Sequence, residues 1–166
     1  MRKLFLLLAF ALPTLSATAQ NKEHQEPYLT RTLSGDAVKE VEARTSGGSI
    51  SVTGVAPSEA RLEVYVSGNN NQKLSKEDIK QRLEEFYNLE ISVTNNKLTA
   101  MAKSKSQIRD WKKALNIAYK IYVPQATSTD LSTSGGSIGL YSLTGSQSFS
   151  TSGGSLHLKQ VSGKIN

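Results

Sequence analysis

Apolar residues and glycines recur every nine residues near the C-terminus. The fixed positions are four glycines, Gly136, Gly145, Gly154 and Gly163, and four apolar residues, Leu131, Leu140, Phe149 and Leu158. Stacked β-coils require such a pattern, because every coil must turn and extend where its neighbour does. The pattern predicts a mainly β protein with short β-solenoid or β-roll-like coils.

An octet that begins Thr-Ser-Gly-Gly-Ser occurs at residues 45–52, 133–140 and 151–158. The last two copies begin 18 residues apart, and a degenerate half-repeat around Gly145 lies between them. We therefore expect an 18-residue coil made of two nine-residue halves, each with one turn and one short strand. The glycines assigned to turns, where glycine tolerates positive φ, are Gly47, Gly48, Gly135, Gly136, Gly145, Gly153, Gly154 and Gly163.

Alternation within these coils predicts which side chains face the core. The inward positions are Ile138, Leu140, Phe149, Leu156 and Leu158, and the outward positions are Gly139, Tyr141, His157 and Lys159. Tyr141, His157 and Lys159 would then form a small aromatic and basic patch on one sheet face. The alternative is that these three are ordinary solvent-facing strand residues without a binding role.

Residues 56–123 follow a different pattern, which predicts an α+β insert that caps the coils. Apolar alternation over 62–66 and 117–123 indicates strands, and 89–102 indicates a hairpin that turns at Asn95-Asn96. Ser75 is placed as the N-cap of one amphipathic helix. Trp111 lies in a polar connection, for which a helical turn is one possibility.

The N-terminus has the parts of a secretory signal peptide. Two basic residues precede the apolar run 4–12, and Ala17-Thr18-Ala19 has the small residues of a cleavage site. The run is shorter than the roughly 20 residues that a spanning helix needs. We expect cleavage after Ala19 and export to the periplasm, the medium or the cell surface of a Gram-negative bacterium, without a transmembrane segment in the mature chain.

The expected organisation has five parts. These are the signal peptide (1–19), a flexible lead-in (20–35), a first β repeat (36–55), the α+β insert (56–123) and the solenoid coils (124–166).

Composition excludes several classes of protein. Removal of Arg2 and Lys3 leaves 18 Lys and Arg against 14 Asp and Glu, a net charge of +4. This excess is too small and too scattered to indicate nucleic-acid binding. The chain has no cysteine, so an exported product depends on backbone ladders and packing rather than on disulfides.

The sequence offers no catalytic, metal or cofactor site. Ser-Gly-Gly-Ser lacks the G-x-S-x-G context of a nucleophilic serine, and His24 and His157 are the only histidines. The octets lack the aspartate of calcium β-roll repeats, and residues 131–166 hold no carboxylate for acid-base chemistry. We expect a protein that is not an enzyme.

The chain stops within another half-coil, at residues 161–166. Such an open edge can accept a strand from another molecule. Two alternatives follow: the chain is a truncated form of a longer repeat protein with incomplete C-terminal coils, or a partner covers the edge. A second copy of the chain, associating through this edge, is one such partner.

The octets, the half-repeats at 143–145 and 161–163, and the strand Glu63-Val64-Tyr65-Val66 resemble the bacterial putative-adhesin domain family. The resemblance covers roughly residues 36–166. It implies an exported protein built from β-strand repeats in a solenoid, and it names no ligand or site residue.

Two functions without catalysis follow from these observations. The first is an exported β-repeat scaffold that acts as an adhesin or contacts an unidentified partner on the surface or in the envelope. The second is a module that binds a glycan or an anionic polymer through an exposed sheet face bearing Tyr141, His157 and Lys159.

Overall fold

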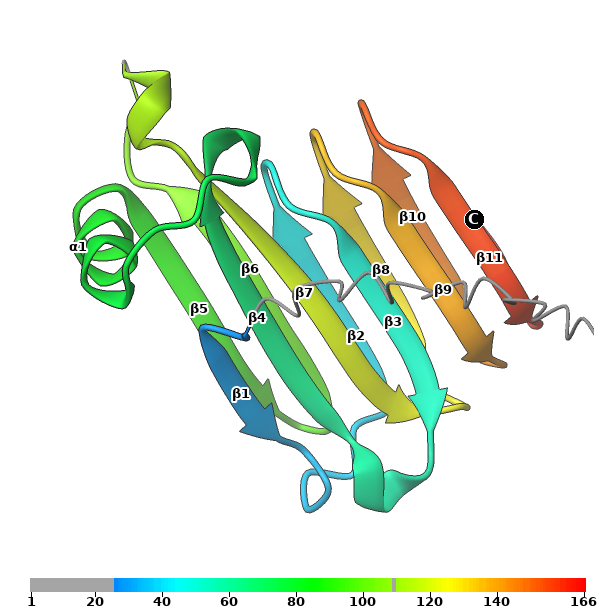
Figure 1. The fold of residues 1–166 in the computed structure, drawn as a ribbon. Helices are drawn as coiled ribbons and strands as arrows, with labels where there is room; N and C mark the ends of the chain where they lie inside the picture. The colour runs from blue at the N-terminus through cyan, green and yellow to red at the C-terminus, as the bar shows by residue number, and fades with distance from the viewer. Residues whose placement is uncertain (1–25, 109) are drawn as a thin grey trace, which may run out of the picture.

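The computed structural model describes residues 26–108 and 110–166, which form a mainly β fold of two mixed sheets with one α-helix (Figure 1). The expected signal peptide, 1–19, lies outside the described residues. The six-stranded sheet contains, in spatial order, β1 (Leu29–Thr32), β4 (Arg61–Gly68), β7 (Leu115–Pro124), β3 (Ile50–Val55), β9 (Ile138–Leu143) and β11 (Leu156–Val161). The five-stranded sheet contains β10 (Gln147–Thr151), β8 (Ser128–Thr133), β2 (Glu40–Thr45), β6 (Lys97–Ser104) and β5 (Tyr87–Thr94).

The repeats pair in parallel, one above another, in both sheets. In the five-stranded sheet Thr45 pairs with Thr133, and Thr133 pairs with Thr151. In the six-stranded sheet Ile50 pairs with Ile138, which pairs in turn with Leu156, 18 residues further along the chain. Equivalent octet positions therefore lie in rows across the sheets.

The threonine that begins each octet hydrogen-bonds to the backbone of the segment on which that octet is stacked, which we call the preceding layer. The hydroxyls of Thr45, Thr133 and Thr151 each donate a hydrogen bond of 2.8 Å to a backbone carbonyl of the preceding layer. The acceptors are the carbonyls of Ile117, Gly48 and Gly136. Each such bond contributes on the order of 1 kcal/mol net.

The second glycine of each octet approaches the same carbonyl. A Cβ built on Gly48 would lie 1.8 Å from the Ile117 oxygen, and a Cβ on Gly136 or Gly154 would lie 2.1 or 2.0 Å from the carbonyl oxygen below it. No side chain fits in this space. The first glycine is less constrained, because a Cβ on Gly135 would meet its nearest atom at 3.5 Å.

These distances correct the predicted reason for the glycines. Among the glycines in the described part of the chain, only Gly163 has a positive φ, of 98°. Gly48, Gly136 and Gly154 are needed because two layers of backbone approach closely, and not because their turns require a left-handed conformation. Sequence periodicity shows where a glycine recurs, but the cause depends on the neighbouring layer.

The insert supplies the layer on which the first octet rests. Ile50 of β3 pairs in parallel with Tyr119 of β7, and β7 pairs in antiparallel fashion with β4. The predicted hairpin is confirmed as β5 and β6, and Asn95 and Asn96 at its turn have φ values of 53° and 62°. The carbonyl of Ile117 in β7 thus begins the column that continues through Gly48 and Gly136.

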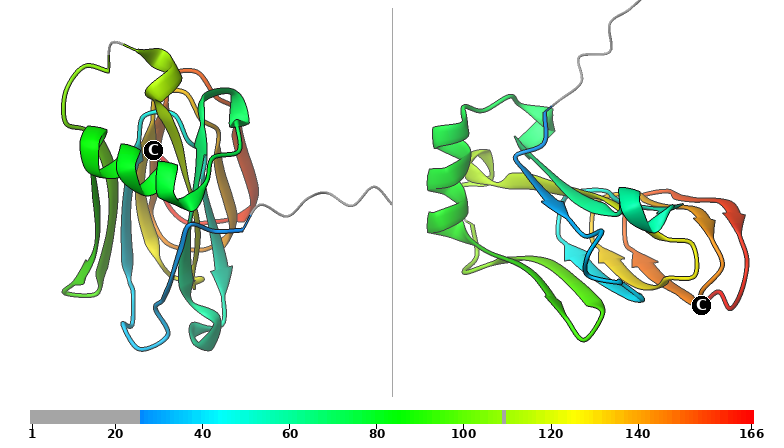
Figure 2. Two further views of the ribbon diagram at one scale, coloured as in Figure 1. Left: turned by 60° about the vertical axis from the view of Figure 1, so that its left-hand side comes forward. Right: turned by 90° about the horizontal axis from the view of Figure 1, so that it is seen from below.

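The predicted helix is confirmed as α1 (Lys76–Phe86). The Ser75 side chain accepts a hydrogen bond from the Asp78 N–H at 3.0 Å, which satisfies one of the free donors at the helix start. Ile79 and Leu83 are buried in the core. Figure 2 shows α1 at the end of the molecule away from the C-terminus, where it covers the opening between the sheets. Three short 3-10 turns complete the fold: η1 (Pro57–Glu59), η2 (Asn69–Asn71) and η3 (Trp111–Lys113).

The expected flexible lead-in, 20–35, is wrong over residues 29–32. These residues form β1, which pairs with β4 along the edge of the six-stranded sheet. The strand is mostly exposed and therefore lacks the alternation by which the other strands are recognised. Its pairing with a distant strand, rather than its local pattern, makes it regular.

The six-stranded sheet ends at β11, and this edge is open among the described residues. Leu156 and Leu158 pair with the fully buried Ile138 and Leu140, yet both are 42% exposed, because no described residue lies beyond them. Their predicted inward direction therefore does not bury them. Beyond β11, residues 164–166 lie along β10. Ile165 bridges to Gln147, whose N–H donates to the Lys164 carbonyl at 2.7 Å and whose carbonyl accepts from the Asn166 N–H at 2.9 Å.

Substitution of the paired glycines separates close approach from turn conformation. We expect Gly136→Ala to lower the free energy of unfolding by about 1–3 kcal/mol, the range for overpacking a tight site. Gly135→Ala should change it by less than ~0.5 kcal/mol, as at an uncrowded surface position. Urea unfolding followed by circular dichroism measures both, and equal losses for the two variants would contradict the column of close contacts.

Candidate functional site on the outer face of the six-stranded sheet

The outer face of the six-stranded sheet carries two rows of side chains that cross five strands. One row contains Arg61, Tyr122, Thr53, Tyr141 and Lys159, and the other contains Glu63, Lys120, Ser51, Gly139 and His157. Tyr65 lies beside the second row on β4. Alternation explains the rows, because the intervening residues of each strand point into the core. We call these eleven positions the basic aromatic face.

Cations cover two of the tyrosine rings on this face. The Arg61 guanidinium carbon lies 3.7 Å from the centroid of the Tyr122 ring. The Lys120 ammonium lies 4.5 Å from the centroid of Tyr65. Both distances are within the range of cation-π attraction. The rings therefore hold positive charge close to the sheet surface.

Glu63 is the single carboxylate on the face, and its neighbours satisfy it. It accepts hydrogen bonds of 2.8 Å from the Arg61 guanidinium and from the Tyr65 hydroxyl. Burial raises the pKa of Glu63, but these two hydrogen bonds outweigh burial and lower it overall. Burial and the bond to Glu63 raise the pKa of Tyr65 to about 12. With Glu63 neutralised locally, Lys120 and Lys159 leave the face positive.

The three predicted contact residues lie together at the open end of this face. Lys159 pairs with Tyr141, and His157 pairs with Gly139. The Tyr141 ring lies over Gly139, where an added Cβ would come within 2.8 Å of it. The structure thus brings Tyr141, His157 and Lys159 side by side, and their binding role stays a prediction.

The remaining charged and aromatic side chains of the face were missed by sequence reasoning. They are Arg61, Glu63, Tyr65, Lys120 and Tyr122, all in the insert. A local signal exists, because polar and aromatic residues alternate with apolar ones over 61–66 and 117–123. That signal shows that these side chains share a face of their own strand, but it does not show that β4 and β7 continue the face of β9 and β11.

No three His, Cys, Asp or Glu residues within 26–108 and 110–166 are placed so that they could hold a metal ion. No helix in these segments has the length and apolar character needed to cross a membrane.

Comparisons with known proteins show similarity in structure. No family model and no characterised sequence matches this chain. A crystal structure described as a putative cell adhesion protein from Clostridium sporogenes is similar, with a TM-score of 0.52 and 11% identity over 82% of this chain. A structure described as a putative adhesin from Bacteroides fragilis aligns with a TM-score of 0.42 and 16% identity, also over 82% of this chain.

The likeness to the Clostridium protein shows a shared fold. Its description agrees with the resemblance to the bacterial putative-adhesin domain family that the octets indicate. The chain spans 62% of the length of that protein and 59% of the Bacteroides protein.

The contribution of Glu63 to the free energy of unfolding should depend on pH. Because its pKa is lowered in the folded protein, the stabilisation is present above the ordinary value of 4.5 and is lost as the pH falls through the folded value. We expect Glu63→Gln to be less stable than the unmodified chain at pH 7, with the difference shrinking towards pH 3. Urea unfolding across this range measures it. Glu90→Gln, at an exposed strand position, is the control, and an equal pH dependence in both variants would contradict the assignment.

Proposed function

We propose that this chain is an exported adhesive domain without catalytic activity, in which a β-solenoid scaffold presents the basic aromatic face to an anionic polymer such as an acidic glycan. The observation that carries the proposal is the alignment of Arg61, Lys120 and Lys159 with three tyrosine rings on one sheet face. The similarity to a protein described as a putative cell adhesion protein supports an adhesive role at the cell surface.

The shape of the face favours a long ligand over a small enclosed one. Four strand spacings separate Arg61 on β4 from Lys159 on β11, which corresponds to ~19 Å at the usual spacing of about 4.8 Å. A polymer with regularly spaced negative charges can follow such a row and contact several cations at once. Tyrosine rings add stacking surface with a hydroxyl that can hydrogen-bond.

The scaffold part of the proposal rests on the column of octets. Each octet repeats the same threonine bond and the same glycine approach to the layer beneath it. Layers built in this way can be added without changing the outer face, as in solenoid proteins. Each added layer would extend both rows of the basic aromatic face by one strand.

The absence of catalysis is proposed from the chemistry of the face. Acid-base catalysis needs a carboxylate or histidine with freedom to exchange a proton near the substrate. Glu63 is held by Arg61 and Tyr65, and the neighbour of His157 in its row is Gly139, which offers no carboxylate. The face is suited to binding rather than to bond cleavage.

Retention on an anionic polymer tests the proposed face. We expect the chain to bind immobilised polygalacturonate, and to bind less as salt rises, because salt screens exposed charges. The double variant Lys120→Gln/Lys159→Gln should weaken binding at least about fivefold, which corresponds to ~1 kcal/mol, and Tyr141→Ala should also weaken it. Lys103→Gln, on the other sheet, is the matched control. Binding that all variants share equally would refute the face.

Self-association through the open end is the second part of the proposal. The Ser155 carbonyl accepts a hydrogen bond of 3.0 Å from the Ile138 N–H of β9. Because backbone groups alternate in direction along a strand, the N–H and C=O groups of Leu156 and Leu158 point to the outer edge of β11. The side chains of the same two leucines are exposed. A second copy that aligns its own β11 along this edge would pair the backbone groups and cover both apolar side chains, as in other strand additions.

Sedimentation velocity of the chain from residue 20 tests this association. We expect a dimer at micromolar concentration, and a monomer for Leu158→Lys, because the new charge would be buried in the interface. Leu29→Lys, at the edge strand β1 of the same sheet, is the control, and circular dichroism checks that both variants fold. A monomer at all concentrations, or a dimer that Leu158→Lys leaves intact, would exclude pairing through β11.

A further inference from the structure

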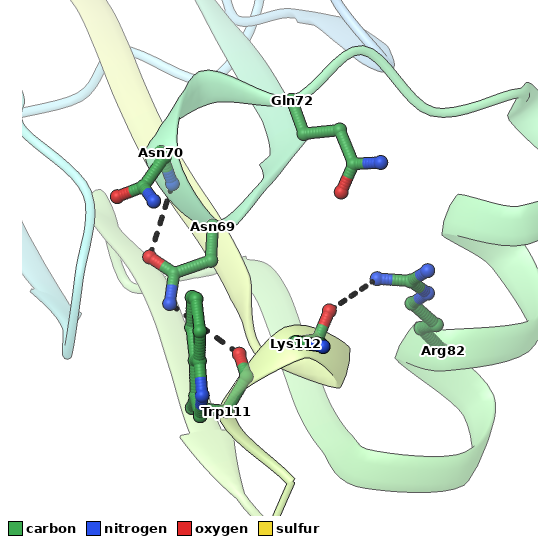
Figure 3. A pocket seen from close by; sticks show the side chains of 6 residues that line it. All are labelled: Asn69, Asn70, Gln72, Arg82, Trp111 and Lys112. Atoms are coloured by element: carbon green, nitrogen blue, oxygen red, sulfur yellow. Dashed lines mark hydrogen bonds between the residues drawn. The ribbon is translucent and has the colours of Figure 1, made fainter.

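A pocket lies where α1, η2 and η3 meet (Figure 3), at the end of the molecule opposite β11 (Figure 1). Its volume is about 480 Å³, within the usual range for small-molecule sites. None of the residues that line it belongs to the basic aromatic face. They are Asn69, Asn70, Gln72, Arg82, Trp111 and Lys112.

Trp111 is the only tryptophan of the chain, and its side chain is 56% exposed. Tryptophan is usually buried for most of its surface. The backbone that carries it is held at the η3 turn, because the Trp111 carbonyl accepts hydrogen bonds from the Ala114 N–H at 3.1 Å and from the Asn69 amide at 3.3 Å. The indole presents a flat aromatic surface at the wall of the pocket.

The amide groups of the pocket divide into two kinds. Asn69 is occupied, since its side chain donates to Trp111 and accepts from the Asn70 N–H at 3.0 Å. The side chains of Asn70 and Gln72 make no hydrogen bond within the described part of the chain. Each offers two donor hydrogens and an acceptor oxygen. This combination matches a sugar hydroxyl, which both donates and accepts.

The charge of the pocket is positive. The Arg82 guanidinium donates one hydrogen bond, of 3.0 Å, to the Lys112 carbonyl, and this bond joins α1 to η3. Arg82 forms no ion pair with a carboxylate in the described residues, and no carboxylate lines the pocket. Figure 3 shows Arg82 and Gln72 across the pocket from the indole. A guanidinium with free donors is the side chain best suited to bind a carboxylate in two-point geometry.

We infer that this pocket binds a carboxylated sugar unit, such as a uronic or sialic acid residue. The sugar ring stacks on Trp111, its hydroxyls pair with the amides of Asn70 and Gln72, and its carboxylate pairs with Arg82. Lys112 adds a second positive charge at the rim. This site is independent of the proposed face, because it uses other elements, and it recognises one sugar rather than a row of charges along a polymer.

Tryptophan fluorescence reports on this pocket alone, because Trp111 has no counterpart elsewhere in the chain. We expect sialyllactose or trigalacturonate, titrated into the chain from residue 20, to change the emission in a saturable manner. Lactose, which carries no carboxylate, should produce no saturable change at the same concentrations. Absence of a saturable change with both acidic sugars, or equal binding of lactose, would overturn the inference.

Variants then assign the contacts by isothermal titration calorimetry. Trp111→Ala and Arg82→Gln should each weaken binding of the acidic sugar about tenfold or more, which corresponds to ~1.4 kcal/mol. Gln72→Ala should weaken it by a smaller factor. Lys103→Gln should leave it unchanged, because Lys103 lies in β6 of the other sheet and does not line the pocket. Loss of binding in Tyr141→Ala but not in Trp111→Ala would move the site to the face and overturn the pocket.

A nucleotide is the other ligand class that combines a flat ring with negative charge. Adenosine monophosphate in the same fluorescence titration distinguishes the two. Tighter binding of the nucleotide than of both acidic sugars would overturn the sugar assignment, whereas weaker binding or none would support it.

Discussion

Close contact between successive layers of backbone is the constraint on which the rest of the structure depends. A carbonyl of each layer receives both the threonine hydroxyl and the second glycine of the octet above it. The hydroxyl bond holds the layers together, and the missing side chain lets them approach closely enough for the ladders on either side to form. The Thr-Ser-Gly-Gly-Ser motif thus stabilises the stacking of one octet on another. Its last serine contributes a further hydrogen bond, since the Ser49 and Ser137 hydroxyls accept from backbone N–H groups of the next layer.

The two ends of the stack of octets differ in what covers them. At one end the insert supplies the first carbonyl, from Ile117, and α1 buries Ile79 and Leu83. At the other end Leu156 and Leu158 occupy core positions without a covering layer. The outer face of the six-stranded sheet runs between these ends. A rigid ladder keeps its side chains at a regular spacing, which suits repeated contacts with a polymer.

The two proposed binding surfaces use the fold in different ways. The basic aromatic face depends on strand register, because residues from the insert and from the repeats must fall in the same rows. The Trp111 pocket depends on two 3-10 turns, η2 and η3, and on α1, none of which belongs to the repeats. An adhesive protein can combine a broad charged face, which attracts a polymer, with a pocket that selects one of its sugars.

Local pattern determined most of the strands, α1 with its Ser75 cap and the β5-β6 hairpin, because burial on one side of an element leaves a period in its own residues. It also located Tyr141, His157 and Lys159 on one side of their strands. Only the tertiary structure decided that β1 is a strand, that Arg61 and Tyr122 continue the row of Tyr141, and that Gly136 is required by a carbonyl of another layer. The pocket beside Trp111 also depends on the tertiary structure, because residues of η2, α1 and η3 line it together. Each of these features is a contact between segments far apart in the chain, and such contacts leave no periodic trace in either segment alone.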